Sequence, residues 1–170
     1  AGAAVGATPL AKAGQYLAVG AGADVQFVLT SRLRAVEPNA CAGVLGRRVT
    51  SLAADAGAAA GVLYAGLDNG DVLVFATRRK DQAACRLLQR IPRRGGDGAA
   101  AGPARVSVAR GYLLTTSGPT LSVYNTTGIG ADGAGGGRAR WLFDHTADEA
   151  EAEGGEGGGG GGGDDCGAGA

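Results

Sequence analysis

The sequence predicts an all-β protein of about three four-stranded antiparallel repeats, followed by a glycine-rich tail. Two observations predict it. Apolar segments alternate with short turns through residues 14–127, and Tyr16, Tyr64 and Tyr112 recur at a constant spacing of 48 residues. A long repeat made of several short strands is typical of stacked β-sheets.

Each of these tyrosines begins a segment that reads as a β-hairpin. The segments YLAVGAGADVQFVL, YAGLDNGDVLVF and YLLTTSGPTLSVY predict hairpins near 15–29, 62–77 and 111–125. Flanking apolar segments supply the outer strands. They are RVTSLAAD at 48–55 and CRLLQRI at 85–91 in the middle copy, SRLRAVE at 31–37 in the first copy, ARVSVAR at 104–110 in the third, and RARWLFD at 138–144 as a closing strand.

The hairpin turns predict how the strands pair. Asn69-Gly70 fits a two-residue type I′ loop, which needs positive φ at both positions and would place Asp68 opposite Asp71. Gly22-Ala23 fits a type II′ loop that places Leu17 opposite Val28. Gly118-Pro119 fits a loop of the same length, with proline at the second position.

The two central strands of the middle copy are apolar on both faces. Residues 62–67 and 72–77 show no polar alternation, which predicts that this hairpin is covered from both sides.

The middle hairpin, from Leu63 to Phe75, resembles the second and third strands of a blade in the β-propeller superfamily, of the WD40-like or quinoprotein-like kind. The resemblance covers residues 14–127 as a partial propeller. The Trp-Asp ending of WD40 repeats is missing, because Trp141 is followed by Leu142. The tryptophan motif of quinoprotein repeats is missing too, so no subfamily is assigned. A closed ring needs four to eight blades, so the resemblance implies further blades from elsewhere in the protein or from a partner.

Residues 128–170 are expected to form a disordered, acidic, low-complexity tail. Residues 154–163 are glycine apart from Glu156, which leaves too little apolar surface to offset the entropy cost of ordering. Residues 1–130 carry 14 Lys and Arg against 7 Asp and Glu, whereas residues 131–170 carry 2 against 9. A nucleic-acid binder with a self-masking tail has such a pattern, but so does a solvated surface followed by an acidic tail.

The cysteines and the apolar segments indicate the cellular compartment in which the protein is expected. Cys41, Cys85 and Cys166 are widely spaced, which suggests neither a disulfide framework nor a zinc site and favours a reducing, cytoplasmic compartment. Cys85 is expected to be a small buried apolar side chain. No apolar run approaches the roughly 20 residues of a membrane span. The sequence contains no Met, which indicates a piece of a longer chain.

Two glycine-containing motifs suggest ligands. Counting a calcium loop from Asp68 puts Gly70, Val72 and Arg79 at ligand positions 3, 5 and 12, so a plain turn is the better interpretation. Residues 128–133 match G-x-G-x-x-G, but the following AGGGRAR cannot begin the helix that would hold a pyrophosphate.

No other residue combination predicts catalysis. His145 lacks a serine in a nucleophile turn and a positioned partner. The basic groups Arg78-Arg79-Lys80 and Arg93-Arg94 are not interleaved with aromatic residues, so nucleic-acid binding is not expected. Asn125-Thr126-Thr127 is an N-x-T triplet that would accept a glycan in the secretory pathway only.

These observations predict no catalytic, cofactor-binding or metal site. The hypothesis that follows is a non-enzymatic interaction scaffold, whose partner is another protein or the remaining blades of the same propeller. The alternative is a cofactor-using or secreted ectodomain propeller of the quinoprotein-like type, with its active residues outside this segment.

Overall fold

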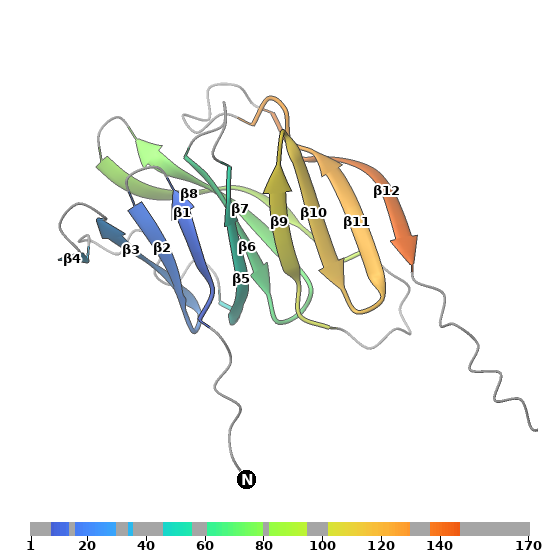
Figure 1. Ribbon diagram of the computed structural model, residues 1–170, viewed down its shortest axis with the longest axis horizontal. Coiled ribbons are helices and arrows are strands. Elements are labelled where there is room, and N and C mark those ends of the chain that lie inside the picture. Colours follow the sequence, from blue (N-terminus) through green and yellow to red (C-terminus); the bar gives the residue numbers. More distant parts are fainter. Residues whose placement is uncertain are drawn as a thin grey trace, which may run out of the picture.

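The computed structural model (Figure 1) describes residues 8–13, 16–29, 34–35, 46–55, 61–79, 82–94, 102–129 and 137–146. Most of the expected tail, at 130–136 and 147–170, lies outside these ranges. Within them every regular element is a β-strand, which confirms the all-β class. No helix in these ranges has the length and apolar character that crossing a membrane requires.

The twelve strands of the described ranges form three four-stranded antiparallel sheets, each of which follows the chain order. The first sheet contains β1 Leu10–Ala13, β2 Tyr16–Ala21, β3 Asp24–Leu29 and β4 Arg34–Ala35. The second contains β5 Val49–Ala54, β6 Val62–Leu67, β7 Val72–Arg79 and β8 Gln82–Ile91. The third contains β9 Arg105–Ala109, β10 Tyr112–Ser117, β11 Thr120–Asn125 and β12 Arg140–Thr146.

The second sheet lies between the other two (Figure 1). One apolar cluster joins it to the first sheet and contains Tyr16, Phe27, Leu63 and Phe75. A second cluster joins its opposite face to the third sheet and contains Tyr64, Val74, Leu113 and Tyr124. Every residue of β6 is buried, which confirms that the middle hairpin is covered from both sides. The first strands of the three sheets are neighbours, because β5 contacts both β1 and β9.

Two of the three predicted hairpin turns are confirmed. Ala21 pairs with Asp24 and Leu17 with Val28 around Gly22-Ala23, and Gly22 has a φ of 64°. Ser117 pairs with Thr120 around Gly118-Pro119. Both loops therefore have two residues.

The type I′ prediction for Asn69-Gly70 is wrong by one residue. Gly66 pairs with Val72, and the Leu67 N–H donates to the Asp71 carbonyl over 2.9 Å, so the loop has three residues. The Gly70 N–H donates to the Leu67 carbonyl, and Gly70 alone in this loop has positive φ, 88°. This geometry is a type I turn closed by a left-handed glycine, which the Asn-Gly pair also permits.

The strand predictions otherwise differ mainly at the ends. The structure places β12 two residues later than 138–144. The strand β1 was missed, because Leu10–Ala13 is short and rich in alanine, without the β-branched and aromatic residues that indicate a strand.

The expectation for Cys85 is also wrong. Its side chain is only partly buried beside the first apolar cluster, and it is disulfide-bonded. Cys41 and Cys166 lie outside the described residues. The wide spacing of the cysteines in the sequence therefore did not exclude a disulfide.

Gly70→Ala should destabilise the fold more than Gly22→Ala. Both residues have positive φ, and this strain alone costs an L-residue roughly 1–2 kcal/mol. A Cβ on Gly70 would also lie 2.7 Å from Ser117 Oγ and 2.9 Å from Arg93 Cδ, whereas a Cβ on Gly22 meets nothing within 4 Å. Urea denaturation of both variants measures the difference, and equal losses of stability would contradict the packing assigned to Gly70.

Candidate functional site

The acidic turn at 68–71 is built as a structural network. Asp71 is 6% exposed. Its Oδ2 accepts hydrogen bonds from Asn69 Nδ2 and Arg90 Nε, each 2.9 Å long. The same oxygen forms an ion pair with Arg90 Nη2. Its Oδ1 accepts from the Arg93 N–H over 3.0 Å. Both carboxylate oxygens therefore accept hydrogen bonds, and these bonds link the β6–β7 turn to the end of β8.

This network lowers the pKa of Asp71. Burial, the largest effect, would raise the pKa, but the hydrogen bonds from Arg90, Arg93 and Asn69 together outweigh it. The folded-state pKa thus lies below the ordinary value of 3.8. The stability that follows is fully present above the unfolded-state pKa and is lost as pH falls through the folded-state pKa.

Asp71→Asn should therefore destabilise the protein at pH 7, by about 1–3 kcal/mol, because it leaves partly buried donors without their charged acceptor. The difference from the unsubstituted chain should shrink as pH falls below about 4. Asp144→Asn is the matched control, since its ion pair with Arg94 is more exposed and contributes at most about 1 kcal/mol. Denaturation curves at pH 7 and pH 3 measure both, and a loss for Asp71→Asn that does not depend on pH would contradict the role of the carboxylate.

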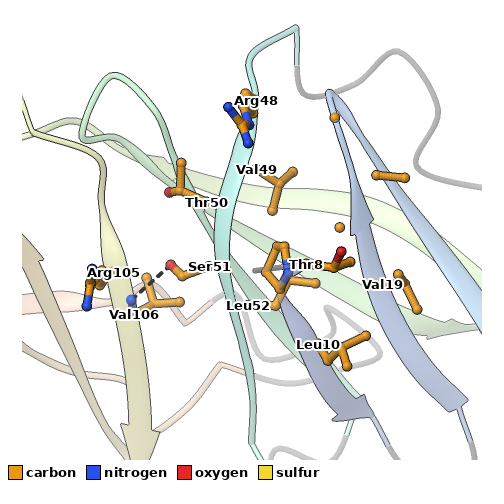
Figure 2. Close-up of a pocket in the computed structure, with 14 residues that line it drawn as sticks. Thr8, Leu10, Val19, Arg48, Val49, Thr50, Ser51, Leu52, Arg105 and Val106 are labelled. Carbon is orange, nitrogen blue, oxygen red and sulfur yellow. Dashed lines mark hydrogen bonds between the residues drawn. The ribbon is translucent and has the colours of Figure 1, made fainter. Parts of the chain in front are cut away.

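An open hollow of about 890 Å³ lies where the first strands of the three sheets meet. Figure 2 shows Arg48, Thr50 and Ser51 along β5 and just before it. Arg105 and Val106 of β9 lie on one side, and Leu10 and Val19 of the first sheet lie on the other (Figure 2). The hollow is therefore bordered by all three sheets.

The hydroxyl groups of Thr50 and Ser51 in the hollow join two sheets. Thr50 Oγ1 and Ser51 Oγ both donate to the Ala104 carbonyl, over 2.7 and 2.9 Å. Ser51 Oγ also accepts from the Val106 N–H at 3.1 Å, the bond drawn in Figure 2. Gly66 permits this approach, because a Cβ there would lie 2.5 Å from the Ala104 carbonyl oxygen. These hydroxyls thus have structural partners rather than a free, activated geometry.

The charge in the hollow is positive. Arg48 and Arg105 line it, no Asp or Glu does, and neither arginine forms an ion pair within the described ranges. No aromatic side chain lines it, so it lacks the stacking surface of single-stranded nucleic-acid sites. The arrangement can attract an anionic group but supplies no paired nucleophile and base from its lining.

A second candidate surface is the face of the third sheet that points away from the second. We call it the open face. Leu114, Val123 and Phe143 are paired side by side across β10, β11 and β12. Tyr112 and Leu121 lie on the same side, because side chains alternate along a strand and their neighbours Leu113 and Ser122 are buried. Phe143 is 52% exposed and Tyr112 is 45% exposed.

The repeated tyrosines show what such a face does elsewhere in the chain. Tyr16 of the first sheet lies in the cluster shared with the second sheet, and Tyr64 of the second lies in the cluster shared with the third. Each therefore points toward the next sheet along the chain. Tyr112 points in the same direction from the third sheet, where the described residues place no further sheet.

The residues considered from the sequence are dispersed. His145 lies in β12, opposite Leu121 and exposed, instead of in a loose segment. Arg94, from the predicted basic group Arg93-Arg94, forms an ion pair with Asp144 at 3.0 Å and lies 4.2 Å from the centre of the Trp141 ring. It therefore links β12 to the end of the second sheet. The side chains of Arg78 and Arg79 and all of Lys80 lie outside the described part, as do residues 130–133 of the glycine motif.

Sequence reasoning missed both surfaces. The open face had a local signal, because the predicted closing strand at 138–144 contains the apolar run Trp141-Leu142-Phe143. The hollow had no such signal, since Arg48 and Arg105 border one space only because the sheets stack.

No protein-family model matches the chain, and no curated protein is significantly similar to it.

Proposed function

We propose that this protein is a non-enzymatic protein–protein interaction scaffold built on WD40-like propeller blades, and that the open face is its interaction surface. The observation that carries the proposal is the exposure of Tyr112 and Phe143 on a face whose counterparts in the first two sheets are covered. A contiguous apolar surface of this kind marks a binding site in a folded protein.

The occupant that fits best is another antiparallel sheet. The first two sheets each use this face to bury apolar side chains against a neighbouring sheet, as stacked sheets do. The row of Leu114, Val123 and Phe143 is suited to the same packing. The remaining blades of one propeller, or a partner protein that presents a similar sheet, would supply it.

The residues that line the hollow are also better suited to binding than to catalysis. Its arginines are suited to an acidic group of a partner, because guanidinium groups bind carboxylates in a planar, bidentate manner. The hydroxyls of Thr50 and Ser51 already form hydrogen bonds with Ala104 and Val106. A scaffold therefore accounts for both surfaces without an additional catalytic group.

The second candidate is a secreted propeller. The disulfide of Cys85 favours it, because stable disulfides form mainly in oxidising compartments. This candidate concerns where the protein works and is compatible with an interaction surface on the open face.

Phe143→Asp should weaken association through the open face by roughly tenfold or more, which corresponds to about 1.4 kcal/mol. A charge placed among Leu114 and Val123 loses its hydration when a sheet covers it. Leu87→Asp is the control, because Leu87 is similarly exposed, at 43%, but lies in β8 of the second sheet. Light scattering over a range of concentrations measures self-association of the chain when no partner covers the open face.

The chain should form oligomers that Phe143→Asp reduces and Leu87→Asp leaves unchanged. A stable monomer at all concentrations, or equal effects of the two substitutions, would contradict the open face as an interaction surface. Turnover of a small molecule by the purified protein would contradict the non-enzymatic assignment.

A further inference from the structure

The triplet Asn125-Thr126-Thr127 lies where β11 ends. Asn125 is the last residue of the strand, and the Thr127 side chain is exposed to solvent. Thr126 is 1% exposed, so it anchors the triplet while its neighbours remain at the surface. The sequence pattern is that of an acceptor for N-linked glycosylation.

The Asn125 side chain is held through its amide oxygen. Asn125 Oδ1 accepts hydrogen bonds from the Thr127 N–H at 2.8 Å and from Thr127 Oγ1 at 2.5 Å. Because a backbone N–H can only donate, the atom facing it must be the carbonyl oxygen. The Nδ2 atom, where a glycan would be attached, then lies on the other branch of the amide. It makes no hydrogen bond within the described residues.

The disulfide of Cys85 is an independent observation that favours the secretory pathway. Cys85 belongs to a different sheet and is disulfide-bonded. Disulfides persist in secreted proteins and in the endoplasmic reticulum, and they are rare in the cytosol. The same compartments modify N-x-T triplets, so the disulfide supplies the condition that the triplet alone does not.

We propose that Asn125 carries an N-linked glycan and that the chain folds in the secretory pathway. In the transfer step, Asn125 Nδ2 attacks the anomeric carbon of an oligosaccharide carried on a lipid pyrophosphate. An N–C bond forms, the C–O bond to the pyrophosphate breaks, and the lipid pyrophosphate leaves. Nδ2 loses one proton to a base of the transferase, and no oxidation or reduction occurs.

The glycan would lie at one end of the open face. Asn125 pairs with Tyr112 and Arg140 at one end of the open face, and its side chain is bonded to its own loop. Val123, in the row with Leu114 and Phe143, lies two residues earlier, which is about 7 Å along the strand. The glycan would therefore stand beside Tyr112 at one end of the open face, and a covering sheet would have to pack on Tyr112 while leaving Asn125 at its border.

Mass spectrometry of the protein isolated from its own source tests the proposal. Trypsin releases residues 111–138 as one peptide, in which Asn125 is the single asparagine. An amidase that removes N-glycans in heavy-oxygen water should convert Asn125 to an isotopically labelled Asp. Recovery of this peptide with unmodified Asn125, before any enzyme treatment, as the dominant form would overturn the proposal.

Matched variants expressed in secreting eukaryotic cells assign the site. Thr127→Ser keeps the hydroxyl and should remain glycosylated, whereas Thr127→Val and Asn125→Gln should lose the mass of the glycan. Glycosylation occurs as the chain enters the endoplasmic reticulum, so the gel shift is read even if a variant folds poorly. A glycan that persists in Thr127→Val and Asn125→Gln would place it elsewhere and overturn the assignment.

Discussion

The constraint on which this structure depends is that a sheet apolar on both faces must be covered on both. The hairpin of β6 and β7 meets this condition, since Leu63 and Phe75 pack on the first sheet and Tyr64 and Val74 on the third. Burial of such side chains contributes about 1.5–3 kcal/mol each, which makes the stacked sheets the main source of stability. Polar groups add specific links, since Asp71 holds the β6–β7 turn to the end of β8 and Ser51 joins the second sheet to the third.

The same constraint links the fold to the proposed function. A stack of sheets that use one face to bind the next sheet ends in a face of the same kind, and here that face carries Tyr112, Leu114, Val123 and Phe143. The surface is therefore a product of the repeat itself. The hollow beside β5 has a similar origin, because it forms where the first strands of the three sheets converge.

The sequence predicted the parts of the fold that depend on local chemistry. The turns at Gly22-Ala23 and Gly118-Pro119, and the two-sided burial of β6, follow from residue types and spacing. The pairing around Asn69-Gly70 did not, because Asn-Gly permits two loop lengths and the contacts of Asp71 with Arg90 and Arg93 lie 19 and 22 residues away. The disulfide of Cys85 and the placement of Arg48 and Arg105 around one hollow also depend on segments that are distant in the sequence. Of the two candidate surfaces, only the open face could be recognised from a local sequence feature, the apolar run of β12.

Hydroxyl-radical footprinting of the three repeated tyrosines tests the central claim most directly, which is that the open face binds a further sheet. In the isolated chain, Tyr112 should be oxidised readily, whereas Tyr16 and Tyr64, at 7% and 0% exposure, should be protected. In the protein as isolated from its source, with its partner or further blades in place, Tyr112 should become as protected as the other two. Equal reactivity of Tyr112 in both states would contradict the account.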